Sequence, residues 1–182
     1  MMGLTLADAV PLRAVIQQRI KDDVVARNRI AVATVAKGET PEAPAVTVDT
    51  YTARIAEARQ DFRTLDRLMA EANLRTTLEW DGQTLSLLEA IQLAKDLRQA
   101  IVEYKALGAH PRVTRAKTGG FLREATELLE VAQYDPVWYQ QEAERLMRRV
   151  VRLSRVIDRI NETVAIDFPA ARKYMMLDDD GD

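Results

Sequence analysis

The chain has 182 residues, of which 47% are hydrophobic and 30% are charged, and its formal net charge at pH 7 is -2. This composition is typical of a folded protein, and the small net charge gives no general attraction to nucleic acid or anionic lipid. The chain has only 7 glycines and 6 prolines, which favours helix, and it has no cysteine, which excludes disulfides and thiolate metal sites.

A cytoplasmic location is expected, or a place in a virion if the gene belongs to a phage. The first residues lack a basic leader followed by an apolar run, which a secretion signal would require. No stretch approaches the roughly 20 uninterrupted apolar residues of a membrane span. We therefore expect no membrane contact.

The first helix is predicted from about Leu6 to Ala36. Thr5 and Asp8 have the spacing of a capping box, in which the hydroxyl and the carboxylate satisfy free amides at the helix start. Pro11 predicts either a kink or a later start near that residue, because proline inside a helix removes a hydrogen bond. Gly38 and the proline-containing residues after it predict a loop.

The second helix is predicted from Asp49 to about Leu74. Its apolar residues are spaced by four and three in turn, which is the heptad repeat of a coiled coil. The larger residues of this seam are Tyr51, Ile55, Phe62, Leu65 and Met69. A short β-hairpin is then expected near residues 76–86, because the Asp81-Gly82 pair can adopt the positive φ angles of a tight turn.

The third helix is predicted to begin at a second capping box, formed by Ser86 and Glu89, and to end near Gly108. Residues 109–134 are predicted to be irregular. Within them, residues 121–134 are compatible with either a short helix or a strand, because a short apolar run does not distinguish the two.

The fourth helix is predicted from Pro136, with Asp135 as its cap, to about Asp167. It repeats the spacing of four and three. The seam residues that we assign to it are Leu146, Val150, Leu153, Ile157, Ile160 and Val164. Residues 175–182 are expected to form a flexible acidic tail.

The predicted fold is therefore all-α, an elongated antiparallel bundle or set of coiled-coil hairpins of about four helices, in one domain over residues 1–174. A helix of about 30 residues is about 45 Å long, whereas a compact globule of this chain length is only about 40 Å across. Such a bundle leaves apolar faces that a second copy can cover. We therefore expect a homo-oligomer, between a dimer and a hexamer.

The fourth helix also carries an arginine stripe that two interpretations can explain. It consists of Arg145, Arg148, Arg152, Arg155 and Arg159. These residues either bind phosphate or another anion, or they form a solvated outer face. Acidic residues interrupt the stripe and no aromatic residues interleave to stack on bases, so the solvated face is favoured and nucleic acid is not the expected partner.

No combination of residues predicts catalysis, a metal site or a cofactor. His110 is the single histidine and lies beside Pro111 in a loop, so we expect neither a histidine metal site nor a Ser-His-Asp triad within one chain. Gly119-Gly120 is an isolated pair without the spacing of a phosphate-binding loop. We expect a protein that is not an enzyme.

Several short motifs follow one another in a recognisable order: Asn73-Leu74-Arg75-Thr76, Gly82, Thr84-Leu85 with Leu88, Asp96, and Arg112-Val113-Thr114-Arg115. With these motifs, the order of elements resembles that of the septicolysin-like family of small helical bacterial proteins. An additional segment around residues 118–128 and the lack of an Asn-Trp pair between Asn161 and Phe168 depart from the family pattern. The resemblance implies a helical, oligomeric protein with no established activity.

Two functions follow as expectations. The first is a non-enzymatic, self-assembling structural or scaffold protein, either in a cell or as a component of a larger particle such as a phage virion. The alternative is a nucleic-acid- or anion-binding module that uses the arginine stripe.

Overall fold

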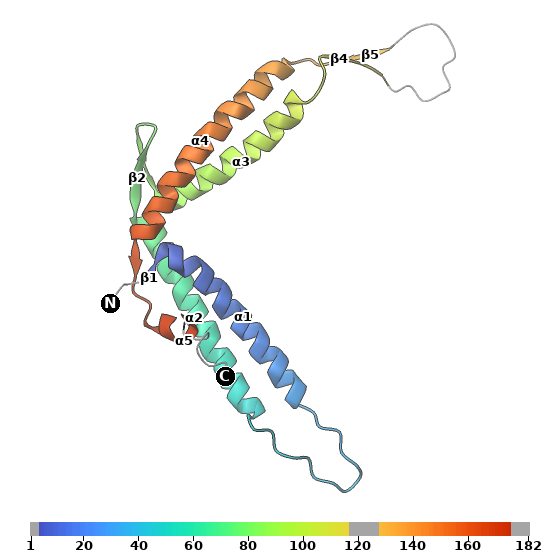
Figure 1. The fold of residues 1–182 in the computed structure, drawn as a ribbon, viewed down its shortest axis with the longest axis vertical. Coiled ribbons are helices and arrows are strands. Elements are labelled where there is room, and N and C mark those ends of the chain that lie inside the picture. Colours follow the sequence, from blue (N-terminus) through green and yellow to red (C-terminus); the bar gives the residue numbers. More distant parts are fainter. Residues whose placement is uncertain (1–3, 117–127, 176–182) are drawn as a thin grey trace, which may run out of the picture. The chain divides into compact units, whose positions relative to one another are not determined.

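The computed structural model describes residues 4–116 and 128–175. The fold is mainly α-helical, as the sequence predicts, and it also contains short two-stranded sheets, of which the sequence predicts the β2–β3 hairpin (Figure 1). Its contacts group into two compact units. In the described part of the chain, unit 1 comprises residues 4–77 and 158–175, and unit 2 comprises residues 78–116 and 128–157.

Unit 1 is built on an antiparallel pair of helices, α1 (Leu6–Ile30) and α2 (Val48–Arg75). The predicted capping box starts α1, because the Thr5 hydroxyl accepts from the Asp8 amide at 3.1 Å and the Asp8 carboxylate accepts from the Thr5 amide at 3.0 Å. The helix then continues through Pro11, so the alternative of a start near Pro11 is wrong.

Helix α1 ends at Ile30 and not near Ala36 as predicted. The residues beyond its end include Val32 and Val35, which are exposed. β-branched residues are poor helix formers, and most helical stability in proteins comes from packing. Because these side chains make no buried contact, nothing holds the extra turns in a helix.

A small sheet closes unit 1. Strand β1 (Leu4–Thr5) pairs antiparallel with β6 (Ala165–Ile166), and the Leu6 amide donates to the Val164 carbonyl at 2.9 Å. This pairing explains why the fourth predicted helix, α4 (Pro136–Thr163), stops before Asp167, where the sequence analysis placed its end. Residues that pair in a strand cannot also continue the helix.

After β6 the chain forms the 3₁₀ helix η1 (Pro169–Ala171) and the short helix α5 (Arg172–Met175). Tyr174 is buried, so the chain is ordered to the end of α5. Met175, predicted as the first residue of the flexible tail, is instead the last residue of α5. Residues 176–182 of the predicted tail lie outside the described residues.

Unit 2 begins with the predicted hairpin, formed by β2 (Thr77–Trp80) and β3 (Gln83–Ser86). Asp81 and Gly82 connect the strands with φ angles of 50° and 78°. Helix α3 (Leu87–Gly108) follows at once. Its capping box is as predicted, because the Ser86 hydroxyl accepts from the Glu89 amide at 3.2 Å.

Helices α3 and α4 form the second antiparallel pair (Figure 1). A Cβ added to Gly108 would lie 2.9 Å from the backbone nitrogen of Gln140. The Tyr104 ring meets the Tyr139 ring edge-on, with 5.2 Å between centroids. The larger residues buried along the pair are Leu87, Leu97, Ile101, Leu146, Val150, Leu153 and Ile157.

Residues 109–134, predicted to be irregular, contain a further strand pair in their described part. Strand β4 (Val113–Arg115) is antiparallel to β5 (Leu129–Val131). All six residues are exposed, so this sheet contributes backbone pairing and no core. The residues between the strands, 117–127, lie outside the described part of the chain. The predictions of one domain, an elongated shape and a coiled coil concern both units together and stay predictions.

Candidate interaction surfaces

The predicted seams lie largely in the interior of the chain's own helix pairs. Ile55 and Leu65 of α2 are buried, and Tyr51, Phe62 and Met69 are partly exposed. In α4, Leu146, Val150, Leu153 and Ile157 are buried, whereas Ile160 and Val164 are partly exposed. Because the chain itself covers most of these residues, their role in joining separate copies stays a prediction.

The five arginines of the predicted stripe, Arg145, Arg148, Arg152, Arg155 and Arg159, are all exposed on α4. Two of them already have partners. Arg145 donates to the Glu142 carboxylate at 2.8 Å, and these hydrogen bonds lower the pKa of Glu142. The guanidinium carbon of Arg152 lies 5.9 Å from the centroid of the Trp80 ring, in a cation–π arrangement.

A sixth arginine on α4 lies beside the stripe and fixes the β2–β3 turn. Arg149 donates from Nη2 to Asp81 Oδ2 at 2.6 Å and from Nε to the same oxygen at 2.9 Å. Some cationic side chains of α4 therefore hold unit 2 together, and only part of the arginine set is available to an external anion.

A groove runs between α3 and α4 in unit 2, with a volume of about 530 Å³. Its apolar lining includes three side chains that remain open to solvent, with exposed fractions of 63% for Val102, 39% for Met147 and 43% for Val151. The other residues that line the groove are Ile101, Val150, Arg98, Lys105, Ser154 and Arg155.

The charge on this groove has one sign. Arg98, Lys105 and Arg155 are cationic, and none of the described residues that line the groove carries a carboxylate. Arg98 donates to the Ser154 hydroxyl at 2.8 Å, which bridges α3 and α4 across the groove. A ligand that combines apolar side chains with carboxylates would match both parts of the surface.

Sequence reasoning missed this groove, although a signal for it exists. Met147 and Val151 directly follow the seam residues Leu146 and Val150, so α4 carries two adjacent apolar rows. A second row widens the apolar stripe beyond what one partner helix covers. Val102 of α3 completes the open patch. No heptad seam was assigned to that helix, so the sequence pattern did not indicate this residue.

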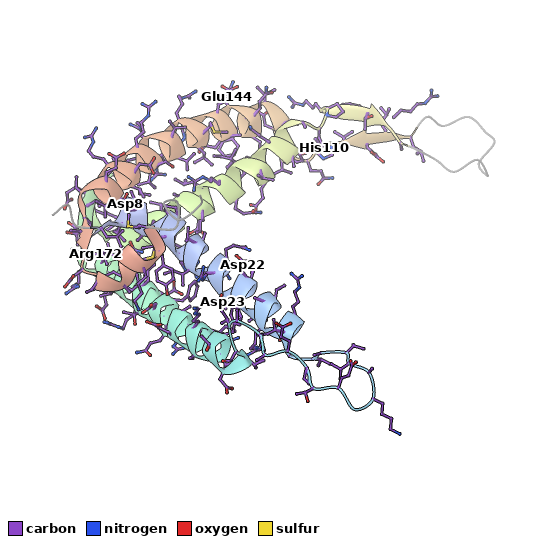
Figure 2. The ribbon with its side chains drawn as sticks, turned by 60° about the horizontal axis from the view of Figure 1, so that its bottom comes forward. Asp8, Asp22, Asp23, His110, Glu144 and Arg172 are labelled. Atoms are coloured by element: carbon purple, nitrogen blue, oxygen red, sulfur yellow. The ribbon has the colours of Figure 1, made fainter. Side chains whose placement is uncertain are left out.

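A second, polar pocket lies between α1, α2 and α5 in unit 1, with a volume of about 290 Å³. Asp23, labelled on α1 in Figure 2, has only 6% of its surface exposed, and its Oδ2 lies 3.4 Å from Arg19 Nε. Lys173 of α5 pairs with Glu57 of α2. The pocket is further lined by Arg54, Ala58 and Tyr174.

The polar pocket holds α5 in place. The Tyr174 hydroxyl donates to Asp61 Oδ2 at 2.8 Å, and burial raises the pKa of Tyr174. Opposite charges from three helices face one another here, so their main effect is to attach the last helix to the α1–α2 pair. Sequence reasoning could not find this pocket, because its residues belong to separate helices and share no spacing.

The described residues hold no cluster of three or more His, Asp or Glu side chains that could bind a metal ion. His110 is exposed beyond the end of α3, where Figure 2 labels it. Among the described helices, none combines the length and apolar character that crossing a membrane requires.

Comparison with known proteins gives a likeness of fold. No family model matches the chain, and no curated protein matches it. The structure is similar to the crystal structure of a functionally unknown conserved protein from Corynebacterium diphtheriae, with a TM-score of 0.64 and 18% sequence identity. The match covers 91% of this chain and 100% of that one. At this identity the likeness concerns the fold alone.

Proposed function

We propose that this protein is a non-enzymatic helical protein that associates with itself and serves as a structural or scaffold component. Its setting would be the cytoplasm, or a larger particle such as a phage virion, and the likeness to the septicolysin-like family is part of the same proposal. The charged side chains of the polar pocket have structural partners, because Lys173 and Tyr174 attach α5 to Glu57 and Asp61, and Arg19 pairs with Asp23 within α1.

The observation that carries the proposal is the open apolar groove of unit 2. Val102, Met147 and Val151 are exposed and line the same groove on the surface of the α3–α4 pair. Contiguous apolar surface of this kind favours contact with another molecule, since covering it removes apolar area from water. Another copy of the chain is the partner that is always present.

The molar mass in solution tests the proposal. We expect an oligomer by sedimentation velocity at micromolar concentration, and we expect Val151→Asp to dissociate it by placing a carboxylate on the contact surface. The matched control is Val25→Asp, because Val25 is an exposed valine of α1, with 67% of its surface exposed. A monomer at every concentration tested would contradict the proposal.

Charged substitutions in the predicted seam would not serve as tests. Val150 and Leu153 are 4% and 0% exposed, so an aspartate at either position would bury an unpaired charge. Such variants would unfold unit 2, and loss of an assembly would then report only the loss of the fold.

A second candidate function is the binding of nucleic acid or another anion by the arginine stripe. The exposure of all five arginines favours it, and the partners of Arg145 and Arg152 weaken it. Titration of duplex DNA and single-stranded RNA at low salt distinguishes the two functions, because phosphate contacts weaken steeply as salt rises. We expect no binding at low ionic strength, and tight, salt-sensitive binding would favour this second function.

A further inference from the structure

The rim of the unit 2 groove argues against two identical grooves facing each other. In such a symmetric contact, the same patch of both copies meets, so Arg98, Lys105 and Arg155 of one copy would approach those of the other. Like charges that lose their water on contact destabilise a complex. The cationic rim therefore favours an occupant that brings carboxylates of its own.

The chain contains one segment with the required chemistry. Residues 175–182 read Met-Met-Leu-Asp-Asp-Asp-Gly-Asp, three apolar residues followed by four carboxylates within five positions. Of these residues, Met175 is described and is 60% exposed at the end of α5. The three apolar side chains match the open patch, and the four carboxylates match the cationic rim.

Unit 1 shows how a helix pair of this fold is covered. Its own chain places Phe168, Ala171 and Tyr174 in buried positions, and Tyr174 is fixed to Asp61 of α2 by a hydrogen bond. On the α3–α4 pair, by contrast, Val102 is 63% exposed. The residues directly after Tyr174 thus follow a residue that is attached to α2. They carry the carboxylates that the lining of the open groove lacks.

We propose that the groove between α3 and α4 binds residues 175–182 of a second copy of this chain. This inference rests on the proposed self-association and names its contact. The contact joins two different surfaces, so each copy offers one groove and one segment, and successive copies form a ring or a filament. In that assembly the apolar residues cover Val102, Met147 and Val151, and the aspartates pair with Arg98, Lys105 and Arg155.

The lengths are compatible. Residues 176–182 can extend over at most about 24 Å. Arg98 and Lys105 are seven residues apart on α3, so the cationic rim of that helix runs along about 10 Å. The segment is long enough to cross the groove while Tyr174 stays attached to its own unit 1.

The first experiment compares the assembly of the natural chain with that of a full-length variant carrying Asp178→Asn, Asp179→Asn, Asp180→Asn and Asp182→Asn, called the four-Asn variant. We expect the molar mass from sedimentation velocity to fall to that of a monomer in the four-Asn variant and in Val151→Asp, with Val25→Asp unchanged. Assembly of the natural chain should also weaken with added salt, because ionic pairing at an exposed rim is screened.

The second experiment measures the contact directly. A dye-labelled peptide of residues 174–182 is titrated into the full-length four-Asn variant and followed by fluorescence anisotropy. We expect saturable binding, weakened about tenfold or more when Val151→Asp is added, because a carboxylate would then face the apolar part of the peptide. A peptide with the same residues in scrambled order should bind more weakly, and far-UV circular dichroism checks that each variant is folded.

The outcomes separate the two proposals. A natural chain and a four-Asn variant of the same oligomeric mass would overturn the segment contact and leave self-association standing. A monomeric natural chain would overturn self-association. If the natural chain were monomeric and the peptide still bound the four-Asn variant, the segment would occupy the groove of its own chain. The contact between copies would then be rejected. Equal binding of both peptides, or binding of DNA in place of the peptide, would also reject it.

Discussion

The two helix pairs of this protein differ in how their surfaces are completed. In the α1–α2 pair, the C-terminal part of the chain adds a third layer, with Tyr174 buried and hydrogen-bonded to Asp61. In the α3–α4 pair, Val102 and Val151 stay exposed above the buried Ile101 and Val150. Two helices alone bury only one face each, and further elements must cover the rest. The uncovered pair is therefore the part of the molecule to examine for binding.

The largest expected effect comes from emptying the interior of each pair. Leu65 and Leu153 are both 0% exposed, so Leu65→Ala and Leu153→Ala should each lower the free energy of unfolding by about 3 kcal/mol. Urea denaturation measures both losses, with the exposed Leu88→Ala as control. A much smaller loss for Leu153→Ala would mean that the α3–α4 interior is loosely packed. The two pairs would then differ in the packing of their interiors as well as in the elements that cover them.

A smaller effect is expected where Gly108 of α3 meets Gln140 of α4. The Cβ of Gly108→Ala would lie 2.9 Å from the Gln140 nitrogen and 3.0 Å from its Cα, so the backbone must shift. We expect a loss of about 2 kcal/mol in the free energy of unfolding. The exposed Ala106→Ser is the control, with a change within about 0.5 kcal/mol. An unchanged midpoint of urea denaturation for Gly108→Ala would show that α3 and α4 are further apart at this position than the 2.9 Å approach indicates.

The attachment of α5 to the α1–α2 pair can be weakened by removing one oxygen atom, the hydroxyl of Tyr174. Tyr174→Phe keeps the ring and removes the hydrogen bond to Asp61, which should cost about 1 kcal/mol. Because burial raises the pKa of Tyr174, the folded chain holds this proton more tightly than the unfolded chain. The associated stability is fully present below the unfolded pKa of about 10 and is lost as pH rises above it.

The pH dependence gives this prediction its own control. Thermal midpoints measured from pH 8 upward should fall more steeply above about pH 10 for the natural chain than for Tyr174→Phe, which has no phenol to titrate. Parallel curves for the two proteins would mean that the Tyr174 hydroxyl is free to ionise, and that α5 does not cover the pair as tightly as its burial indicates.

The smallest effect is expected on the outer face of α4. Arg148 is exposed, so Arg148→Gln should change the free energy of unfolding by no more than about 0.5 kcal/mol. Arg149→Gln is the informative neighbour, because it removes the two hydrogen bonds to Asp81 and should destabilise unit 2 measurably more. Equal effects of the two variants would remove the distinction between a solvated arginine and one that fixes the turn.

Much of the local structure was predictable, because its causes lie within a few residues. The pairs Thr5–Asp8 and Ser86–Glu89 mark two helix starts by their spacing, and both capping boxes form. Asp81 and Gly82 supply the positive φ angles that the β2–β3 turn requires. Helix ends were less predictable, since α1 stops at Ile30 for want of packing partners beyond it.

The candidate site was predictable only in part. The heptad spacing placed Arg148 and Arg155 outside and Val150 and Leu153 inside, as the structure has them. The same spacing could not tell that Met147 and Val151 lack a cover, because exposure depends on which other elements reach them. Nor did any pattern mark the burial of Tyr174, which follows from the return of the chain through β6.

The sequence by itself determined where most helices begin, the tight turn, and which side of α4 is apolar, because capping, φ preferences and helical periodicity act over a few residues. Tertiary structure alone decided which apolar surfaces are covered. Burial is a relation between segments distant in sequence, such as Tyr174 with Asp61, and it leaves Val102, Met147 and Val151 open until a partner with the right charge covers them.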